Sequence, residues 1–199
     1  MRFYPEQVYH IYNRGNNRQK IFFDEENYVF FLRKVRRQLL PHATMLCYCL
    51  MPNHFHFLIY TRADLVQDAL NKAIGILLRS YTRAINLQEE RTGSLFQQKT
   101  QAKPLSYVEL DDGLVDLDFD AHYPVSCFHY IHQNPLVAGL VDRLENWPFS
   151  SFLDYVGFRD GTLCDRDLAC ELLDLPSDVE AFYHLSYQMI DPEKISRFL

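Results

Sequence analysis

The sequence lacks several features that would place it in a specialised class of protein. Its five cysteines are an odd number without a CxxC pair, so a disulfide framework is not expected. No apolar run approaches the roughly 18 residues of a membrane span, and the opening MRFYPEQVYH lacks the basic and apolar regions of an export signal. We find no repeat or low-complexity tract. A cytoplasmic protein with no membrane partner is therefore expected.

The composition predicts a well-buried core. The chain has 199 residues, of which 48% are hydrophobic, enough for one domain or a domain with a small appendage. Its net charge of −6 is unevenly divided: residues 1–105 hold 15 Lys and Arg against 8 Asp and Glu, whereas residues 106–199 hold 5 against 18. A polyanion is expected to contact the first half. The alternative is that both halves are ordinary solvated surface.

The first half alternates between strand and helix patterns. Apolar residues at every second position predict strands, and apolar residues at helical spacing behind two expected N-caps, Asp24 and Asp64, predict helices. The predicted strands are 7–14, 43–50, 54–61 and 95–104, and the helices begin at 24 and 64. This order predicts an α+β fold, a ferredoxin-like βαββαβ antiparallel sheet with helices on one face and the other face open to a partner.

The second half has a different character. The acidic stretch ELDDGLVDLDFD, residues 109–120, is predicted to be an inserted loop. A short helix is expected to begin at Pro124 and to end near Asn134, before the next proline. We therefore predict a main domain at 1–155 and a small helical C-terminal appendage at 156–199.

Two histidines interrupt the apolar segment LMPNHFHFLIY. Because side chains alternate along a strand, His54 and His56 are expected on one face, about 7 Å apart along the strand, while Phe55 and Phe57 pack beneath the helices. Two neutral imidazoles at this separation can share one cation as part of an incomplete metal site. The alternative is a pair of surface or hydrogen-bonded core histidines.

A second group of polar residues lies in FHYIHQNP. Tyr130 and Asn134 are four residues apart in the predicted short helix, so they are expected on the same face about one turn apart. A phenol and an amide carbonyl could then face the same metal ion. The alternative for Tyr130 is a core aromatic residue with a polar tip.

Five segments, in order, resemble the sequence blocks of a known family, the single-tyrosine HUH transposases. They are most similar to the transposases associated with repetitive extragenic palindromes in bacteria. The resemblance extends from about residue 9 to residue 155. Its blocks are YHIYNRGNNRQKIFF, YCLMPNHFHFLI, GSLFQQK, YIHQNPLVAGLV and WPFSSF.

The resemblance implies a metal site and a nucleophile. His54 and His56 match the family's histidine ligands, with Mg²⁺ or Mn²⁺ as the expected ion. Asn134 matches the third protein ligand, and Gln133 is the neighbouring candidate. Tyr130 matches the nucleophile. Rival tyrosines are Tyr81, Tyr107 and Tyr123.

The implied activity is cleavage and rejoining of single-stranded DNA near hairpins through a 5′-phosphotyrosine intermediate. The expected partner is single-stranded or hairpin DNA, bound by a monomer or a homodimer. Basic residues of the first half are the candidates for phosphate contacts: Arg14, Arg18, Lys20, Arg79, Arg83, Lys99 and Lys103.

Two other interpretations stay open. One is an inactive or domesticated relative that binds DNA hairpins without cutting. The other is a metal-dependent phosphodiesterase that uses water as its nucleophile. Formation of a covalent protein–DNA adduct separates them from a transposase.

Overall fold

The computed structural model describes residues 1–66, 68–105, 109–110, 113–114, 123–188 and 190. Its main sheet has the strand order β2-β3-β1-β4, and every neighbouring pair is antiparallel. The strands are β1 (Val8–Arg14), β2 (Thr44–Met51), β3 (His54–Tyr60) and β4 (Gln101–Pro104). Helices α1 (Glu25–Gln38) and α2 (Ala69–Gln88) follow β1 and β3. The predicted ferredoxin-like α+β fold is confirmed.

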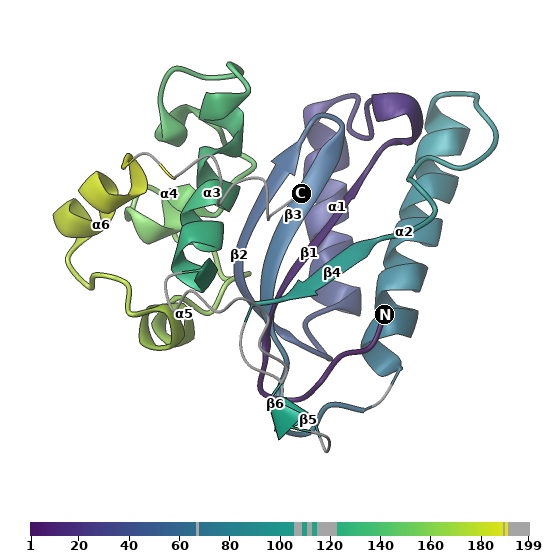
Figure 1. Ribbon diagram of the computed structural model, residues 1–199. Coiled ribbons are helices and arrows are strands. Elements are labelled where there is room, and N and C mark those ends of the chain that lie inside the picture. Colours follow the sequence, from purple (N-terminus) through teal and green to yellow (C-terminus); the bar gives the residue numbers. More distant parts are fainter. Residues whose placement is uncertain (67, 106–108, 111–112, 115–122, 189, 191–199) are drawn as a thin grey trace.

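One face of the sheet, here called the phenylalanine face, packs against α1 and α2 (Figure 1). Phe55 and Phe57 of β3 lie on it and are 1% exposed, and Phe31 of α1 packs against both rings. Tyr81 of α2 completes the cluster, with its ring 4.7 Å from that of Phe31. Strand alternation therefore places the apolar half of β3 beneath the helices, as the sequence predicts.

The start of α1 agrees with the predicted N-cap. The carboxylate of Asp24 accepts a hydrogen bond of 2.8 Å from the backbone N–H of Asn27, which satisfies one of the free donors at the helix end. The expected cap at Asp64 is wrong. That residue lies in a turn, and α2 begins at Ala69, behind Asp68.

The fourth strand is shorter than predicted. Its last four residues form β4 and pair with β1, whereas residues 95–100 are irregular apart from one bridge between Phe96 and Gly15, just past the end of β1. The side chain of Asn13 holds this loop by donating hydrogen bonds to the carbonyl of Gln97 and the hydroxyl of Thr100. These bonds add to two backbone hydrogen bonds, from the N–H of Gln97 to the carbonyl of Arg14 and from the N–H of Asn16 to the carbonyl of Leu95.

The other face of the sheet, here called the histidine face, carries His10, Tyr12, His54, His56 and Lys103, which share it by strand alternation and register. The prediction that this face is open to a partner is wrong in part. Helix α3 (Tyr123–Val137) packs over β2 and β3 on this side. The C-terminal elements gather around α3 (Figure 1). They are η2 (Leu144–Asn146), α4 (Phe152–Tyr155), α5 (Arg166–Leu173) and α6 (Val179–Ser186).

Helix α3 also continues past its expected end. It includes Pro135 and ends at Val137, with Gly139 following at a φ of 66°. A proline inside a helix removes one backbone donor, but the flanking turn is held by the burial of Ile131 against the sheet. Gly139 supplies the left-handed conformation that commonly follows a helix end.

Little of the acidic stretch 109–120 belongs to the described residues. Its first part forms two short paired strands, β5 (Glu109–Leu110) and β6 (Gly113–Leu114). The rest of the predicted inserted loop lies outside them. Among the helices in the described ranges, none combines the length and the apolar character that a membrane span requires.

Candidate active site on the histidine face

The register of the sheet gathers the polar residues of the histidine face. Tyr12 and Arg14 of β1 lie directly opposite His56 and His54 of β3. The rings of the two β3 histidines are 5.0 Å apart and nearly perpendicular, at 88°. His56 is 1% exposed, and His54 is half-buried. The pair therefore forms a recessed corner at the end of β3.

Tyr130 and Asn134 of α3 face this corner. The ring of Tyr130 lies 5.7 Å from that of His56, edge-on at 82°, and is 7% exposed. The side chain of Asn134 donates a 2.8 Å hydrogen bond to the carbonyl of Tyr130. It also hydrogen-bonds with the phenol of Tyr130 and with His54. The structure thus brings these four predicted site residues together.

Burial raises the pKa of Tyr130 to about 12. Its hydrogen bond with Asn134 and the nearby cation Arg14 act in the opposite direction, while Cys127 and Tyr12 add to the rise. The phenol is therefore protonated at neutral pH. It would have to lose its proton during any nucleophilic attack.

The histidines are held in their neutral form. Burial, followed by the charge of Arg14, lowers the pKa of His54 to about 4. The pKa of His56 is lowered well below its usual value, by burial first and then by neighbouring His10, His54 and Arg14. Neutral imidazoles keep a lone pair at neutral pH, which is the state that binds a metal ion.

Hydrogen bonds also fix the tautomer of His54. Its Nδ1 donates to the side-chain oxygen of Asn53 at 2.5 Å, so its lone pair is at Nε2. Within the described part of the chain, Nε2 of His56 is buried without a hydrogen-bond partner. Nitrogens of His10, His129 and His132 are in the same condition, so the state of His56 is compatible with a ligand without requiring one.

These residues fit a divalent ion that takes part of its coordination from elsewhere. Two imidazole nitrogens and the amide oxygen of Asn134 could hold it. The described residues contain no cluster of three or more His, Cys, Asp or Glu side chains that could bind a metal. A metal ion held by these three atoms alone would have further coordination positions, which substrate oxygens could fill.

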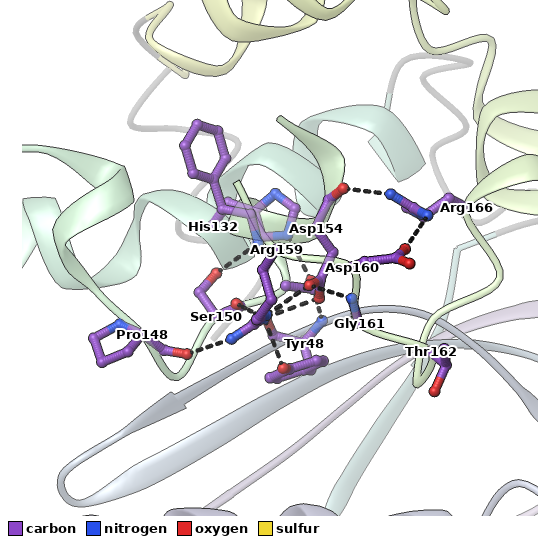
Figure 2. Close-up of polar contacts among 12 residues, drawn as sticks. Tyr48, His132, Pro148, Ser150, Asp154, Arg159, Asp160, Gly161, Thr162 and Arg166 are labelled. Carbon is purple, nitrogen blue, oxygen red and sulfur yellow. Dashed lines mark hydrogen bonds and ion pairs between the residues drawn. The ribbon is translucent and has the colours of Figure 1, made fainter. Parts of the chain in front are cut away.

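A network of hydrogen bonds joins α3, the helix that carries Tyr130, to strand β2. His132 of α3 is hydrogen-bonded to the hydroxyl of Ser151 at 2.8 Å, and Ser151 bonds both backbone groups of Tyr48 in β2. Figure 2 shows Arg159 beside this point, paired with the buried carboxylate of Asp154. The WPFSSF segment thus joins α3 to β2.

The other candidates for the nucleophile and for the third metal ligand either lie away from the site, make other hydrogen bonds or are not described. Tyr81 is buried on the other side of the sheet and donates a hydrogen bond to the carbonyl of Ile21. The amide of Gln133 donates to the carbonyls of Ser186 and Gln188, both at 2.8 Å. Tyr107 lies outside the described residues, and the side chain of Tyr123 is likewise not described.

Two residues of the site were missed by the sequence analysis. His10 and Tyr12 of β1 stack on the ring of His56, at 5.1 Å and 5.7 Å. Tyr12 is thus as near to that histidine as Tyr130 is. The alternation of YHIYNR along β1 carries the signal, because it places both residues on the face of Arg14.

The seven basic candidates for DNA contacts fall into three groups. Arg14 lies opposite His54, and Lys103 lies opposite His10 with its amine 5.8 Å from the ring of Tyr12. Arg18 and Lys20 are exposed at or beside the turn η1 (Asn16–Arg18).

The third group lines a groove between α2 and the β4 edge of the sheet. This groove has a volume of about 1020 Å³. It brings together Arg79 and Arg83 from α2, Lys99 from the loop before β4, and Arg2. Its other described lining residues include many amides and hydroxyls, and no carboxylate. Such a lining suits phosphate oxygens.

The fold and the site define a class: a ferredoxin-like α+β domain with a histidine pair and a tyrosine helix on one face of the sheet. Neither a protein family model nor a curated protein matches the sequence. Among solved structures the chain is similar to one described as a REP-associated tyrosine transposase bound to a REP hairpin. The identity is 18% and the TM-score 0.55, over 90% of this chain and 91% of that one. The likeness shows a shared fold.

Proposed function

We propose that this protein is a metal-dependent transposase or single-strand endonuclease that cleaves and rejoins DNA near hairpins, with Tyr130 as nucleophile. The observation that carries the proposal is the meeting of four side chains: His54 and His56 from β3, and Tyr130 and Asn134 from α3. The similar solved structure, described as bound to a REP hairpin, supports a hairpin DNA as the partner.

The proposed reaction exchanges one phosphodiester for another. The phenol oxygen of Tyr130 attacks the phosphorus, and the bond from phosphorus to the 3′ oxygen breaks. The phenol loses a proton and the leaving oxygen gains one, which gives a 5′-phosphotyrosine and a free 3′ hydroxyl. Because the phosphodiester energy is kept in the new bond, a 3′ hydroxyl can reverse the step and no ATP is needed.

The residues around the phenol would prepare this attack. Arg14 favours the ionised phenol and lies beside His54, where it could contact the scissile phosphate. Asn134 holds the phenol by a hydrogen bond. A bound Mg²⁺ or Mn²⁺ would withdraw charge from the phosphate. Since Tyr130 is only 7% exposed, substrate entry requires some displacement of α3 or of its neighbours.

The groove lies on the α2 side of the sheet, at its β4 edge, and would hold DNA that passes this edge toward the histidine face. Arg79, Arg83 and Lys99 line it, and Arg14 and Lys103 lie on the histidine face. We propose that these charges bind successive phosphates of a hairpin stem or of its single-stranded flank. Arg18 and Lys20, exposed at the first turn, are the outer contacts of this set.

A covalent adduct tests the proposal. The protein is incubated with Mn²⁺ and a labelled pool of DNA hairpins with randomised single-stranded flanks, and then resolved under denaturing conditions. A protein–DNA band is expected for the wild type and for the control Tyr60→Phe, and none for Tyr130→Phe or His56→Ala. Cleaved DNA without an adduct would instead indicate a phosphodiesterase. Bound but uncut DNA would indicate an inactive relative.

A further inference from the structure

A third buried histidine touches the site. His10 of β1 is 0% exposed, and its Nε2 lies 2.8 Å from Nδ1 of His56. The two rings are stacked, with their centroids 5.1 Å apart and their planes inclined by 17°. The ring of Tyr12 stacks on both histidines, 4.8 Å from His10 and 5.7 Å from His56. The ring of His10 is thus fixed by contacts within the sheet.

Only one proton can occupy the hydrogen bond between these two rings. If His10 donates it, neutral His56 must carry its own proton on Nε2, and that nitrogen cannot bind a metal. If His56 donates from Nδ1, its Nε2 keeps a lone pair. The outer nitrogens, Nδ1 of His10 and Nε2 of His56, are both buried without a hydrogen-bond partner among the described residues. A ligand at Nε2 of His56 would satisfy one of them.

We propose that His10 is a positioning residue that accepts a hydrogen bond from Nδ1 of His56 and so directs the Nε2 lone pair of His56 toward a divalent metal. Asn53 has the same relation to His54, whose Nδ1 donates to its side-chain oxygen. In both candidate ligands Nδ1 thus donates to a hydrogen-bond acceptor, as the second ring nitrogen of metal-binding histidines usually does. This inference rests on the proposed function of His56 as a ligand.

The test measures Mn²⁺ affinity by the loss of the free-ion signal in electron paramagnetic resonance. His10→Leu removes the acceptor and is expected to weaken Mn²⁺ binding about 10–100-fold. His10→Gln restores a side-chain oxygen and is expected to recover most of the affinity. The control His129→Leu removes a buried histidine of α3 and should leave Mn²⁺ affinity unchanged. Unchanged affinity in a folded His10→Leu variant would overturn the inference.

A second measurement reads the tautomer in the wild-type protein. Nitrogen-15 spectra with Zn²⁺ as a diamagnetic probe are expected to show His56 protonated at Nδ1 and unprotonated at Nε2. The reverse pattern would overturn the role of His10. Failure of the proposed function looks different: wild type and His56→Ala would then bind Mn²⁺ equally, whatever residue stands at position 10.

Discussion

The two faces of strand β3 differ in what their buried side chains leave unsatisfied. On the phenylalanine face, Phe55 and Phe57 pack against α1 and α2 and need no partner beyond apolar contact. On the histidine face, the same strand buries His56 at 1% exposure with a nitrogen that has no partner in the described chain. Burying such a group costs stability. Both faces bury apolar side chains, Leu58 of β3 among them on the histidine face, but on that face the strand also buries a polar atom without a partner, as the proposed function of His56 requires.

The sharpest way to separate the faces is to make the histidine face apolar. In the double variant His10→Leu/His56→Leu, both partners of one hydrogen bond are replaced, which is often neutral or stabilising. We expect a free energy of unfolding within about 1 kcal/mol of wild type or above it, with complete loss of the DNA adduct. Urea unfolding and the adduct assay measure the two effects. A large loss of stability would contradict the contrast.

The opposite variant acts on the phenylalanine face. Phe31→Ala leaves a cavity between α1 and the sheet, and should lower the free energy of unfolding by about 3–5 kcal/mol. The adduct formed per folded molecule should stay close to wild type, because Phe31 does not contact the site. Loss of the adduct in the folded variant would show that the two faces are coupled.

Two buried histidines of α3, the helix that covers the histidine face, should also make the protein sensitive to acid. Burial lowers the pKa of His129 to about 4 and that of His132 well below its usual value. The unfolded chain gains protons below about pH 6.5, whereas the folded chain resists them, so stability falls from there toward about pH 4. A histidine shifted to about 4 should cost about 2 kcal/mol at pH 5. Urea unfolding at pH 7 and pH 5 measures the loss, and His129→Leu should reduce it.

The smallest expected effects lie in the groove. Replacing Arg79, Arg83 and Lys99 each by Gln should weaken hairpin binding by several-fold per contact. The slope of log affinity against log salt concentration should become less negative by about 0.7–0.9 per lost phosphate contact. The matched control is Arg33→Gln, an exposed position on α1. Binding titrations at several salt concentrations give both values. Equal losses in the control would show that the contacts are not specific to the groove.

Alternation along the strands made much of the fold predictable. It placed Phe55 and Phe57 in the core and the two β3 histidines together on the other face, and the order of elements gave the sheet. The same rule applied to β1 would have found His10 and Tyr12. The hydrogen-bond partner of His10 is His56, which is 46 residues away in the sequence. Only the register of the sheet reveals this contact.

Other features depend on contacts that lie far apart in the sequence. Pro135 reads locally as a stop, yet α3 continues because its residues are buried against the sheet. Asp64 has the chemistry of a cap, yet the helix starts after Asp68. The covering of the histidine face by α3 likewise depends on tertiary packing, which local patterns do not report.

The most direct test is to identify the residue that carries the nucleotide. Tyr12 and Tyr130 both lie 5.7 Å from the ring of His56, so proximity alone does not separate them. After the adduct is trimmed by nuclease and digested with protease, tandem mass spectrometry locates the phosphonucleotide. The account predicts it on Tyr130 alone. A nucleotide on Tyr12, or on no tyrosine while DNA is cut, would contradict it.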